Sequence, residues 1–201
     1  MNAAQGVVPD LESYIEQSRD ASGFRMALDL VQYAGDMDIP DALSADAMFA
    51  RLHDHACDIV VWSAVGPSSL CPTWAIVRTR RITLADTCLV KDIVSCAKGI
   101  PSKHEANIVT VLMRERNVPL ECAVSSAGVL VKQSVDAFVA TEEALLSVSE
   151  FAADHEVRRY LRGLRDWIAG FVNWLYETEL YLGEKGNEVR AFGWVFVPVS
   201  P

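Results

Sequence analysis

Apolar residues recur along most of the chain at alternating steps of three and four, the spacing of one face of an α-helix. The longest stripe predicts a single helix from His155 to Leu182, which Gly183 would end, because a glycine often stands just past a helix end. This stripe consists of Val157, Leu161, Leu164, Ile168, Phe171, Leu175, Thr178 and Leu182.

Five shorter segments show the same helical periodicity. They predict helices near residues 10–21, 24–34, 48–63, 108–117 and 119–145, with a break between the first two at Ser22-Gly23. The chain shows no internal repeats. We therefore predict an all-α fold, a bundle of antiparallel helices.

Residues 65–90 interrupt this pattern. The segment contains a loop-like stretch, GPSSLCP, followed by WAIVRTRRITLADTCLV, which is rich in β-branched residues. It carries three arginines and one aspartate, although the whole chain has a net charge of −9. We therefore expect residues 65–90 to be an insertion, looped or disordered, that packs poorly against the helices.

The composition is that of an ordinary globular protein, with 201 residues, of which 51% are hydrophobic and 22% charged. The acidic balance lacks the basic footprint of nucleic-acid binding and disfavours attraction to an anionic membrane. No apolar run reaches about 18 residues, so we expect no membrane span. The N-terminus shows no signal peptide and the five cysteines form no C-x-x-C pair, which together favour a cytoplasmic protein.

The run from His53 to Asp58, HDHACD, contains residue types that bind metals. On a helix, His53 and Cys57 would share one face and Asp54 and Asp58 another, so the donors would not converge. We expect a solvated helix face here rather than a metal site.

Residues 9–23 read PDLESYIEQSRDASG. This stretch is similar to P-x-L-x-x-Y-I-x-x-R-R-D-T-S-G of fungal sesquiterpene synthases, which have the class I terpenoid fold. The resemblance implies that Arg19 contacts the substrate diphosphate and that the backbone carbonyl of Gly23, at a helix break, faces the departing diphosphate. The alternative is an ordinary exposed Arg19 paired with Asp20 or Glu16.

A second motif of that family, N-D-x-x-S-x-x-x-E, has its counterpart at residues 91–99. In the family its three oxygen donors lie on one helix face and bind magnesium. The matching positions here are Lys91, Ser95 and Gly99, so only Ser95 offers a ligand oxygen. The resemblance implies Mg2+ as cofactor, and we expect this chain to bind it poorly. The alternative for Ser95 is a helix serine bonded to its own backbone.

Residues 160–183 read YLRGLRDWIAGFVNWLYETELYLG. They are similar to the family's Y-x-x-G-L-x-x-W-I-x-G-N-x-x-W-S-x-E-T-x-R-Y-x-G. Tyr181 matches this motif, but Leu180 stands where the family has a diphosphate-binding arginine. Trp174 matches an aromatic residue that lines the cation-holding pocket of related enzymes, and its alternative role is core packing.

The resemblance covers nearly all of residues 1–64 and 91–199. It implies a sesquiterpene synthase, a lyase that uses magnesium to remove diphosphate from a prenyl diphosphate substrate, farnesyl diphosphate, and then cyclises the cation. We expect residues 1–201 to form a single partial domain that lacks the family's upstream Asp-rich motif and is catalytically impaired. The competing hypothesis is a non-catalytic helical remnant, a binding or partner protein, or the product of a translated intron at residues 65–90.

Overall fold

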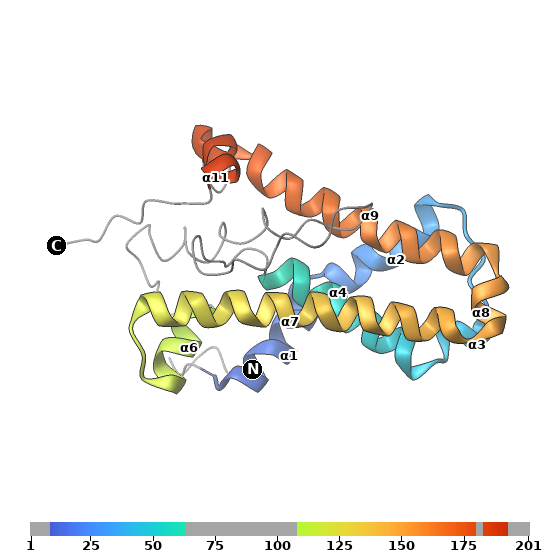
Figure 1. Cartoon of the computed structure of the whole chain (residues 1–201), viewed down its shortest axis with the longest axis horizontal. Coiled ribbons are helices and arrows are strands. Elements are labelled where there is room, and N and C mark those ends of the chain that lie inside the picture. Colours follow the sequence, from blue (N-terminus) through green and yellow to red (C-terminus); the bar gives the residue numbers. More distant parts are fainter. Residues whose placement is uncertain (1–8, 63–107, 180–182, 193–201) are drawn as a thin grey trace.

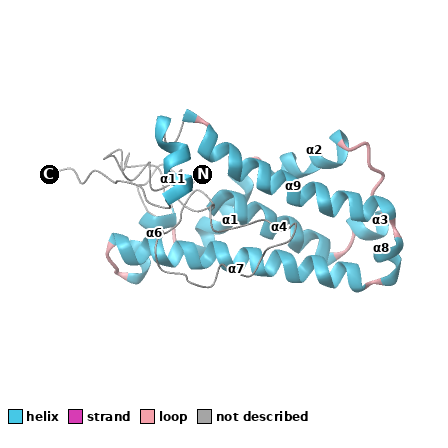
Figure 2. Cartoon of the chain, turned by 45° about the horizontal axis from the view of Figure 1, so that its top comes forward, coloured by secondary structure: helices cyan, strands magenta, loops and turns pink. Residues whose placement is uncertain are grey.

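The computed structural model describes residues 9–62, 108–179 and 183–192, and every regular element in these ranges is a helix (Figures 1 and 2). The prediction of an all-α fold is confirmed. The elements in order are α1 (Leu11–Ala21), α2 (Phe24–Ala34), α3 (Asp41–Ser44), α4 (Ala47–Trp62), α6 (Ile108–Arg116), α7 (Leu120–Ser147), α8 (Ser149–Ala153), α9 (His155–Glu177), the 3-10 helix η3 (Gly183–Lys185) and α11 (Gly186–Phe192).

The two longest helices, α7 and α9, run antiparallel and are joined through the short helix α8 (Figure 1). Helix α4 packs against α7, α9, α2 and α1, while α6 packs against α7 and α1. The buried apolar residues form two clusters, and both include residues of α4 and α7. These two helices therefore form the centre of the bundle, and the ends of α1 and α2 are placed against α4.

Aspartate side chains cap the first turns of α1 and α9. The Asp10 side chain accepts a hydrogen bond from the backbone N–H of Ser13 at the start of α1, and the Asp154 side chain caps α9 in the same way.

Helix α9 ends at Glu177, so the prediction that it continues to Leu182 was wrong. Thr178 has an extended backbone (ψ 133°), which suits a β-branched residue better than a helix interior does.

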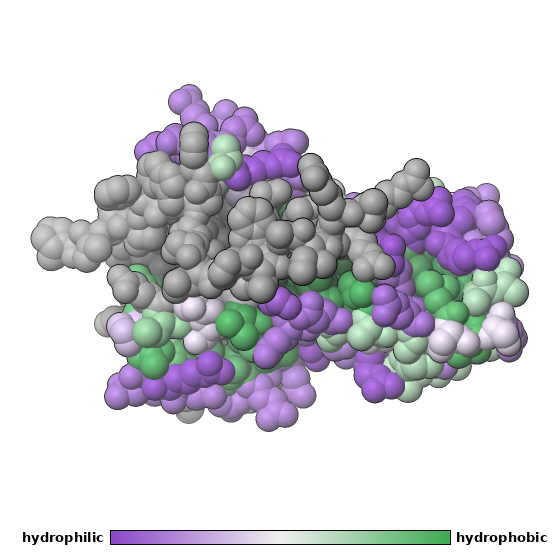
Figure 3. All heavy atoms as spheres, viewed as in Figure 1, coloured by the Kyte–Doolittle hydropathy of each residue, from purple (hydrophilic) through white to green (hydrophobic). Residues whose placement is uncertain are grey.

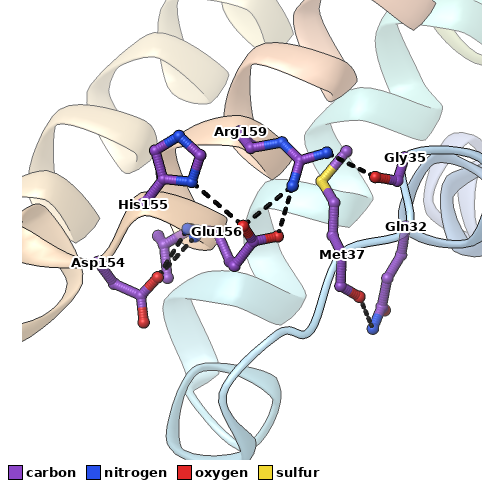
Figure 4. Close-up of polar contacts among 8 residues, drawn as sticks. Gln32, Gly35, Met37, Asp154, His155, Glu156 and Arg159 are labelled. Atoms are coloured by element: carbon purple, nitrogen blue, oxygen red, sulfur yellow. Dashed lines mark hydrogen bonds and ion pairs between the residues drawn. The ribbon is translucent and has the colours of Figure 1, made fainter.

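The end of α2 is fastened to the start of α9 by polar contacts (Figure 4). The guanidinium of Arg159 donates a 2.6 Å hydrogen bond to the carbonyl oxygen of Gly35, at a helix end where carbonyl groups lack partners within the helix. Glu156 pairs with the same arginine at 2.9 Å. These contacts connect the C-terminal end of α2 to the N-terminal end of α9.

Helices α2 and α9 also approach closely at Gly163. A Cβ atom at that position would lie 2.7 Å from Cγ1 of Val31 on α2, a distance that real Cβ atoms do not adopt. The glycine of the Y-x-x-G-L stretch therefore has a packing role, since it lets the two helices come together.

Within α7, the stretch Cys122–Ser147 is long and apolar enough to cross a membrane by length and composition alone. The same helix packs against α4 and α6 in the bundle. Figure 3 shows hydrophobic residues at the surface over α7 between hydrophilic ones. The absence of a membrane span remains a prediction.

Candidate functional site

The break between α1 and α2 is built around Gly23. Its φ of +71° lies in the left-handed region, which glycine adopts without the strain that a Cβ atom would cause. The hydroxyl of Ser22 donates a hydrogen bond to the Arg19 carbonyl at 3.1 Å and accepts one from the Phe24 N–H at 3.3 Å. The predicted helix break at Ser22-Gly23 is confirmed, and local hydrogen bonds hold its shape.

Arg19, in the last turn of α1, points to α4 rather than along its own helix. Its Nε and Nη2 atoms donate hydrogen bonds of 2.7 and 2.6 Å to the two carboxylate oxygens of Asp58, whose side chain is only 4% exposed. This two-bond geometry matches the planar fork of a guanidinium to a carboxylate. The alternative of an exposed Arg19 paired with Asp20 or Glu16 does not hold, because its short hydrogen bonds go to an aspartate on another helix.

A second aspartate, Asp54, lies one turn before Asp58 on α4 and also faces the break. One of its oxygens accepts a 2.6 Å hydrogen bond from Nη2 of Arg25 on α2, and the other lies 3.7 Å from Nη1 of Arg19. Two carboxylates of α4 thus pair with two arginines, one from each side of the α1–α2 break.

Burial and pairing act in opposite directions on these charges. Burial raises the pKa of the Asp58 carboxyl, and the hydrogen bonds from Arg19 partly offset that increase. The hydrogen bonds to Asp58 raise the pKa of Arg19. The permanently charged guanidinium favours the ionised carboxylate, so the two groups form an ion pair that is largely shielded from water.

A row of aromatic rings extends from the break along α9. The ring of Phe24, the residue after Gly23, lies 5.1 Å from that of Phe171, which in turn lies 5.6 Å from the ring of Trp174. Trp167 packs edge-on against Phe24 at 5.9 Å. Trp174 is itself 44% exposed, which disfavours the alternative of pure core packing. Its role in a pocket wall stays a prediction.

Phe24, Trp167 and Phe171 were not identified as site residues from the sequence, whereas Trp174 was. Trp167, Phe171 and Trp174 stand at i, i+4 and i+7, so one helix face carries all three. Two features of the sequence could have identified the aromatic row: this spacing on one helix face, and the position of Phe24 directly after the predicted break.

The run from His53 to Asp58 does not form a solvated face, contrary to expectation. Cys57 and Asp58 are buried, and His53 lies 2.8 Å from the Tyr160 hydroxyl. Burial raises the pKa of the Cys57 thiol to about 11, so it is not a ready metal ligand. Among the residues that the structure describes, no group of three His, Cys, Asp or Glu side chains is placed to hold a metal ion.

Several predicted positions lie outside the described residues, namely the 65–90 segment, Lys91, Ser95, Gly99 and Tyr181. The donor chemistry of the predicted magnesium site can still be judged. A lysine, a serine and a glycine supply one hydroxyl oxygen, whereas magnesium is held by several oxygen ligands, carboxylates above all. This set does not fit the ion.

Comparisons with known proteins agree with the fold. The family model described as "Terpene synthase family 2, C-terminal metal binding" matches residues 1–64 and 74–137. Of the segment expected to be an insertion, residues 65–73 are unmatched and residues 74–90 are matched, so the insertion stays a prediction. The match includes the α1–α2 break, α4, α6 and most of α7.

The chain is also similar to curated fungal proteins. It is 33% identical over 190 residues to sesquiterpene synthase 1 of Postia placenta, covering 94% of this chain and 48% of the relative. It is 32% identical to a sesquiterpene synthase of Cyclocybe aegerita, covering 95% and 47%. The chain therefore spans about half the length of these relatives.

Solved structures share the helical arrangement. Germacradien-4-ol synthase from Streptomyces citricolor superposes with a TM-score of 0.62 at 20% identity, over 85% of this chain and 47% of that protein. 2-Methylisoborneol synthase from Streptomyces coelicolor, solved with Mg2+ and geranyl-S-thiolodiphosphate, gives 0.63 at 18% identity, over 86% and 45%. These likenesses establish the fold. The family model, which matches more than half of the chain, shows that the chain belongs to the terpene synthase family, in the region of its C-terminal metal-binding part.

Proposed function

We propose that this chain is the diphosphate-handling part of a sesquiterpene synthase domain, and that by itself it does not cyclise farnesyl diphosphate at a measurable rate. The observation that carries the proposal is the α1–α2 break, where a left-handed Gly23 stands beside the partly buried guanidinium of Arg19. The chain spans about half the length of the curated relatives that it matches.

The residues at the break suit the departure of a diphosphate. Asp58 occupies one edge of the Arg19 guanidinium. On the other side Nη1 lies 3.7 Å from an Asp54 oxygen, beyond hydrogen-bonding distance, and its N–H groups would donate to an oxyanion. The aromatic row from Phe24 to Trp174 would then face the hydrocarbon part, where ring faces stabilise a developing cation. Preorganised donors of this kind act on charge that develops during bond cleavage.

The charge stabilisation that full synthase chemistry needs is not complete in this chain. Magnesium would neutralise the leaving diphosphate, but Lys91, Ser95 and Gly99 do not form a ligand set for it. Leu180 replaces a further diphosphate-binding arginine of the motif. Since the loss of one electrostatic contact costs roughly a hundred- to a thousandfold in rate, several losses together should abolish turnover.

The test is incubation of the purified chain with farnesyl diphosphate and magnesium, followed by gas chromatography of the extract. We expect no cyclic hydrocarbon above background, with sesquiterpene synthase 1 of Postia placenta treated in parallel as the positive control. Terpene product from the unmodified chain would contradict the proposal of an impaired enzyme.

A non-catalytic helical binding protein is the second candidate. It is favoured by the pairing of both arginines at the break with aspartates of the same chain, which leaves no excess positive charge in that cluster.

Sequencing the transcript across residues 65–90 would separate a true insertion from a translated intron. A transcript without this segment would assign the interruption to gene annotation rather than to the protein.

A further inference from the structure

We propose that Arg25 is a second anion-binding arginine beside Arg19, and that the Asp54 carboxylate occupies the position of a ligand oxyanion between them. The inference rests on the proposed function, because it deepens the diphosphate contact assigned to Arg19. It adds Arg25 as a second residue that binds the diphosphate, and Asp54 as a carboxylate that competes with the diphosphate for the two arginines.

The two aspartates of α4 hold the arginines in different ways. Asp58 is nearly inaccessible and makes two short hydrogen bonds to one edge of Arg19. Asp54 is 28% exposed and lies between the two guanidinium groups, at 2.6 Å from Nη2 of Arg25 and 3.7 Å from Nη1 of Arg19. Asp58 is therefore a fixed anchor, whereas Asp54 is an accessible carboxylate on the outer side.

The 3.7 Å contact between Asp54 and Arg19 identifies the position at which a ligand oxyanion would bind. At 3.7 Å, the Asp54 oxygen is beyond hydrogen-bonding distance of Nη1 of Arg19, so that side of the guanidinium is only loosely paired. A diphosphate oxygen carries more charge than a carboxylate oxygen and fits the guanidinium fork equally well. A diphosphate can therefore displace Asp54 from this position without disturbing Asp58.

Charge balance explains why the affinity of the free protein should be low. Two arginines and two aspartates make the cluster neutral, and Asp20 adds a further carboxylate 3.9 Å from Nε of Arg25. An incoming anion meets no net attraction until one carboxylate is removed or displaced. Removal of the Asp54 charge should consequently strengthen anion binding, which is the opposite of what a structural or ligand-supporting aspartate would show.

The test is a calorimetric titration of the full chain with inorganic diphosphate, without metal, at pH 7.5 and an ionic strength of about 0.15 M. Relative to the unmodified chain, we expect Asp54→Asn to bind roughly tenfold more tightly and Arg25→Gln roughly tenfold more weakly, the range typical of charge-assisted contacts. The matched controls are Asp38→Asn and Arg162→Gln, which change the same charges at exposed positions elsewhere. Both controls should stay within about twofold, since exposed distant charges are screened.

The outcomes distinguish failure of the inference about Arg25 and Asp54 from failure of the proposed function. If Arg19→Gln abolishes binding but Asp54→Asn behaves like Asp38→Asn, the inference is overturned and the proposed function stands. If Arg19→Gln leaves binding unchanged, the proposed function itself fails. Absence of binding by a folded Asp54→Asn variant, checked by its helical circular dichroism, also overturns the inference, and Arg25→Gln tests it independently. A gain by Asp54→Asn with farnesyl diphosphate but not with inorganic diphosphate would overturn the assignment to the diphosphate group.

Discussion

The ion pair between Arg19 and Asp58 should contribute measurably to folding stability, because it is shielded from water and joins α1 to α4. Asp58 is 4% exposed and Arg19 is 23% exposed, and two hydrogen bonds of 2.6–2.7 Å connect them. Breaking a buried pair by removing one partner costs about 3–5 kcal/mol. Since Arg19 keeps some contact with water, we expect Asp58→Ala to lower the free energy of unfolding by about 3 kcal/mol, at the lower end of that range.

A double-mutant cycle separates the pair energy from the loss of packing. Urea unfolding of Arg19→Met, Asp58→Ala and the double variant, followed by circular dichroism, should give a coupling energy of about 2 kcal/mol. The control cycle uses the exposed pair Lys132–Asp136, for which about 0.3–0.5 kcal/mol is expected. A coupling energy between Arg19 and Asp58 that is no larger than the control would refute the reasoning.

Two further predictions concern packing and pH. Gly163→Ala should lower the melting temperature, because its Cβ would lie 2.7 Å from Val31, whereas Gly170→Ala, with nothing within 4 Å, should raise it through helix propensity. Burial lowers the pKa of His53 below 6.5, so its contribution to stability is complete above about pH 6.5 and is lost as the pH falls through the folded-state pKa. Urea midpoints from pH 7.5 to 5.0 should fall less steeply in His53→Gln; an equal fall would contradict the assignment.

The helical layout could be predicted from the chain because its causes are local. The apolar spacing of α9, Pro119 before α7 and the Ser22-Gly23 break each act within a few residues, and the structure has helices at all the predicted places in its described part. The end of α9 was misjudged because the apolar stripe continues past Glu177, while the backbone at Thr178 does not remain helical.

The charged part of the site could not be predicted in the same way. Asp58 is 39 residues from Arg19 in sequence, whereas Asp20 and Glu16 are close, so local reasoning favours the wrong partners. The burial of Asp58 follows from the central place of α4 among α1, α2, α3, α7 and α9, which only the tertiary structure shows. The available signal was the shared helix face of Asp54 and Asp58, which we interpreted as a solvated face.

Our central proposal is that this chain keeps a diphosphate contact at the α1–α2 break but has lost the magnesium site of its family. The most direct test is calorimetric titration of the unmodified chain with inorganic diphosphate, in the presence and in the absence of magnesium. We expect weak binding with the same affinity in both conditions, and magnesium dependence only in the restored variant Lys91→Asn/Gly99→Glu/Leu180→Arg. Tight, magnesium-dependent binding by the unmodified chain would contradict the account.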